Sequence, residues 1–153
     1  MEPLAVAAIC DDLRMEATGK PFIIGMYPQI MNFASLPAAV PQIFVLVTVF
    51  SDIKKPILKY TVHITAPGMN ITHEHNSGTL QPSPFQDVTR AEVSVAVPIR
   101  PFIVTAPGVL TVTIKHAEGE LRARRLLLQL ASQPNPPHLF PQELGKPGQD
   151  TRH

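Results

Sequence analysis

Apolar and polar residues alternate along most of this chain. In the segment LKYTVHI, residues 58–64, every second side chain is apolar and the side chains between them are basic or polar. A period of two with β-branched and aromatic residues is typical of a strand with one buried face. Segments 89–97 (TRAEVSVAV) and 109–115 (VLTVTIK) show the same pattern, whereas 42–52 (QIFVLVTVFSD) is almost wholly apolar. This last segment is predicted to be a central strand covered on both faces.

Glycine-containing turns separate the apolar segments. Gly19 stands in EATGKP between two apolar runs, and Gly119 stands in HAEGEL before the last run. Glycine supplies the positive φ that a tight hairpin turn needs. The tetrapeptide TAPG occurs at 65–68 and again at 105–108, but the flanking residues match only in the apolar strand that precedes it. We therefore interpret these segments as two similar turns and not as a duplicated unit.

Prolines interrupt the region between residues 27 and 42, at Pro28, Pro37 and Pro41. Because proline lacks the backbone donor that a central strand needs, the segment QIMNF is expected to form at most a short edge strand.

The segment ELRARRLLLQL, residues 120–130, is predicted to be the final strand, because it follows a glycine turn directly. In this prediction Arg122 and Arg124 face water, and a bulge near Arg125 switches the faces of the strand. The side chains expected in the core are Leu126, Leu128 and Leu130.

About eight such strands, with turns between them and no helical period, predict an all-β fold, an antiparallel β-sandwich. The closing segment 106–130 resembles the last two strands of immunoglobulin-like or C2-like sandwiches. A true antibody-type domain is excluded, because the chain has one cysteine and no tryptophan. The sandwich is expected to span residues 1–131. Residues 132–153 are rich in proline and lack apolar periodicity, so they are predicted to be a disordered, flexible tail.

The composition restricts the partners and the compartment. Thirteen basic and twelve acidic residues leave a net charge of +1, which gives no electrostatic argument for a nucleic acid or a membrane as partner. The only cysteine, Cys10, excludes an internal disulfide and a site with several cysteine ligands. The segment LAVAAICDD resembles a lipoprotein signal, but it lacks the basic region and its apolar run is short. We therefore expect a cytoplasmic protein.

The N-terminal block ICDDLRMEATGKPFIIGMY combines an apolar strand that ends in Cys-Asp-Asp, a Gly-Lys turn and the segment IIGMY. This block is similar to the opening of a family of small uncharacterised bacterial proteins, a domain of unknown function. The resemblance covers roughly residues 5 to 27 and implies a bacterial cytoplasmic β-protein. It implies no activity, cofactor or catalytic residue.

Chemistry is suggested most clearly by NITHEHNSG, residues 70–78, where His73 and His75 stand two positions apart. In an extended strand these two side chains share a face, about 7 Å apart. Neutral imidazoles so placed are a plausible pair of zinc ligands, and a catalytic zinc needs a third protein ligand. The candidates for that third ligand are His63, His116, Glu74 and Asp87. The segment also ends in the turn-forming residues Asn-Ser-Gly, so the favoured interpretation is an exposed, polar hairpin end.

Other candidate residues have simpler interpretations. Cys10 could act as a nucleophile beside a histidine, but two adjacent carboxylates raise a thiol's pKa, so a structural role is favoured. In the tail, Leu139 and Phe140 are candidate partner-binding residues within HLFPQEL. A cationic stripe is possible on the closing hairpin, but the acidic residues beside it favour an ordinary solvated face. Its members would be Lys115, Arg122, Arg124 and Arg125.

Two function classes remain open from the sequence. The first is a non-enzymatic interaction module that binds a protein partner or a second copy of itself and needs no cofactor. The second is a small metal-binding protein or metalloenzyme that holds zinc through His73 and His75. No phosphate-binding glycine loop or nucleophile elbow occurs in the chain, so the first class is favoured.

Overall fold

The structure, a computed structural model, describes residues 2–80 and 88–132. In these residues it contains strands and turns and no helix, so the predicted all-β class is confirmed. The strands are β1 (Leu4–Met15), β2 (Pro21–Met26), β3 (Ile30–Phe33), β4 (Ala38–Val40), β5 (Ile43–Asp52), β6 (Lys59–Ala66), β7 (Met69–Asn76), β8 (Arg90–Ile99), β9 (Phe102–Val104), β10 (Gly108–His116) and β11 (Gly119–Leu130).

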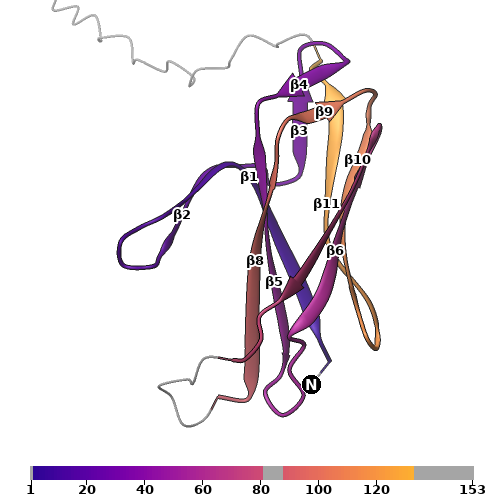
Figure 1. The fold of residues 1–153 in the computed structure, drawn as a ribbon. Coiled ribbons are helices and arrows are strands. Elements are labelled where there is room, and N and C mark those ends of the chain that lie inside the picture. The colour runs from indigo at the N-terminus through magenta and orange to yellow at the C-terminus, as the bar shows by residue number, and fades with distance from the viewer. Residues whose placement is uncertain (1, 81–87, 133–153) are drawn as a thin grey trace, which may run out of the picture.

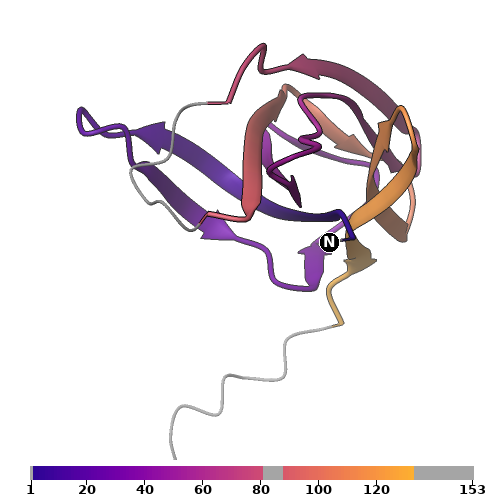
Figure 2. The ribbon, with the colours of Figure 1, turned by 90° about the horizontal axis from the view of Figure 1, so that it is seen from below.

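Two sheets face each other across one core (Figure 1, Figure 2). The first sheet has the strand order β2-β1-β5-β8, and the second has the order β3-β11-β10-β6-β7. Their neighbouring strands are antiparallel except β3 and β11, which run parallel. The fold is therefore an antiparallel β-sandwich, as predicted, although the described residues form eleven strands rather than about eight. Two of the unexpected strands, β4 and β9, have only three residues each, too few to show a period of two.

The core lies between the inner faces of the two sheets, where the alternating apolar positions meet. Every second residue of β5 from Ile43 to Val49 is fully buried, and the alternation predicted for β6, β8 and β10 is also found. Burial of these side chains is the main favourable term for folding. The largest fully buried side chains outside β5 are Phe102, Ile9, Ile64, Leu110, Ile114, Leu126 and Leu128.

The outer face of β5 differs from the prediction that this strand is covered on both faces. Leu46, Thr48 and Phe50 lie on that face and are only partly buried. A two-layer sandwich leaves the outside of each sheet open to solvent, whatever the hydropathy of the strand. Two arginines reduce this exposure, because Arg90 and Arg100 lie over the rings of Phe50 and Phe44, 5.3 and 5.4 Å from the ring centroids.

The two TAPG segments are turns, as predicted, and they lie against each other. Pro67 and Gly68 form the two-residue turn between β6 and β7, since Ala66 pairs with Met69. Gly68 has a φ of +81°, which fits the third position of a type II turn after proline. A methyl group on Gly68 would approach Thr105, the first residue of the second TAPG, to 2.7 Å. The repeated tetrapeptide is therefore a pair of turns in contact, where glycine allows close approach.

The final strand β11 confirms the predicted strand and corrects its faces. Its pairing with β10 shifts between Val112 and Thr113, where Ala123 is the extra residue, so the bulge lies two positions before Arg125. Because of this shift Arg124 pairs with Val112 on the inner side of the sheet and is partly buried, contrary to the prediction that it faces water. Leu130 was predicted in the core, but it is 48% exposed at the end of the strand.

Candidate interaction surface

The most unusual feature of the molecule is a two-stranded ribbon that leaves the sandwich. Strand β1 pairs with β5 only from Leu4 to Cys10, and beyond that point it pairs with β2 alone. Residues 11–26, which we call the arm, therefore extend past the edge of the first sheet. Figure 1 and Figure 2 both show the arm projecting away from the body.

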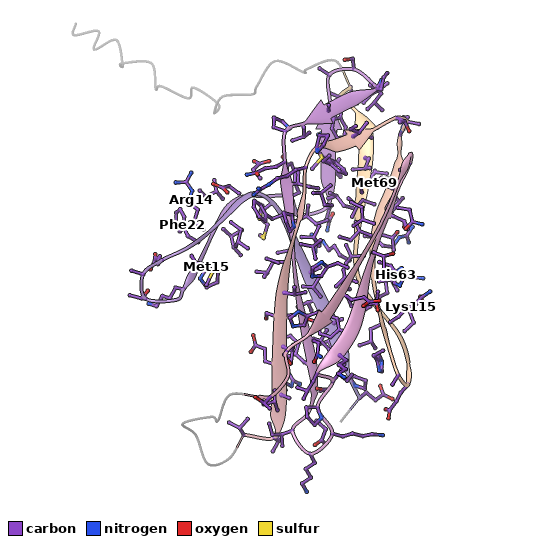
Figure 3. The ribbon with its side chains drawn as sticks, in the orientation of Figure 1. Arg14, Met15, Phe22, His63, Met69 and Lys115 are labelled. Atoms are coloured by element: carbon purple, nitrogen blue, oxygen red, sulfur yellow. The ribbon has the colours of Figure 1, made fainter. Side chains whose placement is uncertain are left out.

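The arm exposes large apolar side chains to solvent. Met15, Phe22 and Met26 are 65, 54 and 60% exposed, and Ile23 is 37% exposed. Phe22 pairs with Arg14, whereas Ile23 pairs with Leu13 on the opposite face, so both faces of the ribbon carry apolar groups. Figure 3 shows Arg14, Met15 and Phe22 standing away from the sandwich. A two-stranded hairpin is marginally stable alone in water, and exposed apolar groups at this density are typical of binding surfaces.

The base of the arm is fixed to both sheets through Tyr27. The backbone N–H of Tyr27 donates to the carbonyl of Ile9 over 2.8 Å, and its hydroxyl donates to a carboxylate oxygen of Asp11. From the second sheet, a guanidinium N–H of Arg124 donates to the carbonyl of Tyr27 over 3.3 Å. Burial, followed by the hydrogen bond to Asp11, raises the pKa of Tyr27 to about 12, so the hydroxyl remains a donor at neutral pH. The arm therefore leaves the body at a defined angle.

Cys10 lies where the arm begins, and it is fully buried between Met26 and Phe44 in the sheet. Burial, with smaller contributions from Asp11 and Asp12, raises the pKa of the Cys10 thiol. A buried thiol with a raised pKa is a poor nucleophile. The geometry therefore agrees with a structural role for Cys10.

His73 and His75 do not lie at an exposed hairpin end, and this is a correction to the sequence-based interpretation. Residues 69–76 form one continuous strand, β7. His73 pairs with Val62 and His75 with Tyr60, so both imidazoles are on the side of the sheet that carries the core. Both are partly buried. The pair does share a face, as predicted, but it faces the interior of the sandwich.

The structure separates the candidate third ligands from the pair. His116 is on the inner side of its sheet, like the pair, but it lies at the end of β10, with β6 between β10 and β7. His63 pairs with Thr72 and Glu74 pairs with Thr61, which places both on the outer side of the sheet. Asp87, like the proposed partner-binding residues Leu139 and Phe140, is outside the described residues. In residues 2–80 and 88–132 there is no group of three or more His, Cys, Asp or Glu that could hold a metal ion. The described chain therefore offers a pair of imidazoles without a third ligand.

His75 has a packing role at the open side of the sandwich. Its ring lies 5.1 Å from the ring of Tyr60, measured between centroids, and its Nε2 atom is buried without a hydrogen-bond partner among the described residues. The hydroxyl of Tyr60 donates to the carbonyl of Val93 over 3.3 Å, which joins β6 to β8 in the opposite sheet. His75 and Val93 also line a groove of about 500 Å³ between β7 and β8. His75 thus packs against Tyr60, whose hydroxyl joins the two sheets.

We expect the stability of the protein to fall as the pH decreases from about 7 to 5, with His75 as a cause. Burial, followed by the charge of His73, lowers the pKa of His75 below its ordinary value of 6.5. The unfolded chain then binds a proton before the folded chain does, and stability decreases with falling pH. Thermal unfolding of wild type and His75→Phe at several pH values will measure this pH dependence. The phenylalanine keeps the ring contact with Tyr60 but has no group that titrates.

The pH dependence of His75→Phe should be weaker than that of wild type in this window. The acidic groups with lowered pKa values, Asp12, Asp52 and Glu118, have ordinary values between 3.8 and 4.5 and titrate below it. If the melting temperatures of wild type and His75→Phe changed equally with pH, His75 would not be a cause of the pH dependence.

The predicted cationic set does not form one stripe. Lys115, Arg122 and Arg125 lie on the outer face of the second sheet, but Arg124 lies on the inner side. Lys115 is 3.9 Å from Glu120, so the outer face carries both signs of charge. Such a surface is an ordinary solvated face.

The arm was not found by sequence reasoning, although the segment contains a signal for it. Residues 21–30, PFIIGMYPQI, include no charged residue, and they contain all of β2. Solvent-exposed edge strands usually carry charges that prevent association. An uncharged apolar strand that is also an edge strand therefore indicates a binding element.

Comparisons with known proteins give no relative for this chain. No family model, no curated protein and no solved structure matches it. In the described residues no helix is long and apolar enough to cross a membrane. The resemblance of the N-terminal block to an uncharacterised bacterial family, and that of the closing hairpin to immunoglobulin-like or C2-like domains, therefore stay predictions.

Proposed function

We propose that this protein is a non-enzymatic binding module whose interaction element is the arm. The observation that carries the proposal is the exposure of Met15, Phe22 and Met26 on a ribbon whose second strand, β2, pairs only with β1 in the described chain. A monomer that left these groups in water would gain nothing from the arm, since a two-stranded ribbon adds little stability of its own.

The anchoring of the arm supports a binding role over a loose loop. The contacts of Tyr27 with Ile9, Asp11 and Arg124 hold the base of the ribbon against both sheets. Along the ribbon Asp12 and Arg14 form an ion pair at 2.8 Å, which lowers the pKa of Asp12. An element that is ordered before binding loses less entropy when the complex forms.

The alternative of a zinc protein receives less support. His73 and His75 lie on the inner side of β7, and the described residues bring no third ligand to them. We therefore propose that the partner is a protein, and not a nucleic acid or a membrane. The module itself needs no cofactor. We propose a cytoplasmic location, which agrees with a single cysteine that is a free, buried thiol.

A photo-crosslinking amino acid tests the proposed function. We expect benzoylphenylalanine in place of Phe22 to give one specific crosslinked protein in living cells of the source organism. The same substitution at Ile103, which is 45% exposed on β9, should not give it. Mass spectrometry will identify the product.

Specificity is measured by competition. Excess wild-type protein should abolish the product, and excess Met15→Ser/Met26→Ser protein should not, because it lacks two apolar side chains of the arm. The proposal fails when positions 22 and 103 give the same products, or when neither gives any.

A further inference from the structure

The free edge of β2 is the least protected edge of the two large sheets in the described part of the chain. β2 and β8 are the edges of the first sheet, and β3 and β7 are the edges of the second. β8 carries Arg90, Glu92 and Pro98, which discourage the addition of another strand. β7 carries Glu74 among polar residues, and β3 has only four residues. β2, with the sequence PFIIGM, has no charge and has proline only at its first position.

The hydrogen bonds of the arm show which backbone groups of β2 point to the free edge. At the tip, the N–H of Glu16 donates to the carbonyl of Lys20 over 2.9 Å. Antiparallel pairs alternate between bonded and non-bonded, so the pairs Arg14–Phe22 and Asp12–Ile24 are bonded and Leu13–Ile23 is not. The N–H of Leu13 donates to the Asp12 side chain over 2.9 Å, which agrees with Leu13 and Ile23 being a non-bonded pair. The N–H and carbonyl of Ile23 therefore point outward.

We propose that β2 pairs antiparallel with β2 of a second copy of this chain, so that two arms form a four-stranded ribbon across a two-fold axis near Ile23. This inference rests on the proposed binding role of the arm and names its partner. A strand that pairs with itself about a two-fold axis needs no other sequence, and each added strand satisfies outward backbone groups. Without charges in β2, the two copies meet with no like charges opposed.

Antiparallel pairing also keeps the lysines at the tips of the two arms apart. Lys20 is exposed at the tip, directly before β2. With the axis at Ile23, Lys20 of one copy stands opposite the uncharged Met26 of the other copy, whereas a parallel arrangement would place the two Lys20 residues side by side. The apolar side chains Phe22 and Met26 of both copies become neighbours across the new pair.

Substitution of Ile23 by a charged residue of either sign tests the dimer. Purified full-length chain should have twice the monomer mass of 16.7 kDa by light scattering over a range of concentrations. Ile23→Lys and Ile23→Glu should each raise the dimer dissociation constant about tenfold or more, because two like charges oppose each other at the axis. An equimolar mixture of the two variants should form dimers again, since opposite charges then meet.

Several outcomes separate this inference from the proposed function. Ile103→Lys, on β9 far along the chain from the arm, should dimerise like wild type. A wild-type chain that stays monomeric overturns the inference but not the binding role of the arm, which the crosslink from position 22 tests by itself. Dimers that persist in Ile23→Lys place the interface elsewhere and also overturn it. Failure of the mixture to dimerise, with variants whose circular dichroism equals that of wild type, overturns the two-fold pairing at Ile23.

Discussion

Phe102→Ala is expected to destabilise the protein by about 3–5 kcal/mol, the largest effect of any substitution considered for this chain. Phe102 is the largest of the fully buried side chains, and it lies on β9, which pairs with β4. Removal of the ring loses its transfer free energy and leaves a cavity that short strands cannot fill by a small shift. The melting temperature should fall by about 10 °C or more, as differential scanning calorimetry will show.

The neighbouring residue provides the control for this prediction. Ile103 is on the same strand, one position later, and is 45% exposed. Ile103→Ala should cost about 1 kcal/mol or less, because most of its side chain is already in water. If the two variants lost equal stability, β9 would not be part of the packed core.

Gly68→Ala is expected to cost about 2–4 kcal/mol. Two effects add at this position: a φ of +81° is unfavourable for any residue with a Cβ, and the new methyl group would lie 2.7 Å from Thr105. Because Thr105 belongs to the turn before β10, the substitution separates two turns that normally touch. Urea unfolding of the variant and the wild type will measure the loss.

A second glycine separates the two effects. Gly78 has a φ of +71°, but a Cβ there would meet nothing within 4 Å. Gly78→Ala should therefore show the backbone effect alone, about 1–2 kcal/mol. Thr105→Ala should recover part of the loss in a Gly68→Ala background, which a double-mutant cycle will quantify. Equal losses for the Gly68 and Gly78 variants would mean that the contact with Thr105 costs nothing.

Local patterns were sufficient to predict the strands β6, β8 and β10, because each of them alternates over at least six residues. The turn at Gly19 and the final strand 120–130 were predicted from adjacent residues, and the structure confirms both, with the strand beginning at Gly119. Strands β4 and β9 were not predicted, since three residues between prolines and bends carry no period. Their pairing depends on contacts between distant parts of the chain.

The orientation of His73 and His75 could have been predicted from the length of the preceding turn. A two-residue turn at Pro67 and Gly68 pairs Ala66 with Met69, and counting outward then pairs Val62 with His73. One residue more or less in the turn would reverse the faces. Alternation alone shows that two residues share a face of a strand, but the register decides which face is buried.

The arm could not be predicted from alternation, because a strand looks the same in sequence whether it is covered or projects into solvent. What distinguishes the arm is that β5 ends its pairing at Phe44, opposite Cys10, while β1 continues to Met15. That difference in length depends on how the two strands pair, so the sequence of either segment alone does not show it. The uncharged sequence of β2 was the only local sign.

The hydrogen bond from Arg124 to the backbone of Tyr27 restricts the direction in which the arm projects from the sandwich. A force on the tip of the ribbon is transmitted at its root to two strands at once, β1 in one sheet and β11 in the other. Bending the arm therefore strains hydrogen bonds to both layers, and this resists a change in its direction. A partner that binds the arm consequently also orients the sandwich. Two molecules joined through their arms would therefore keep a constant angle between their sandwiches.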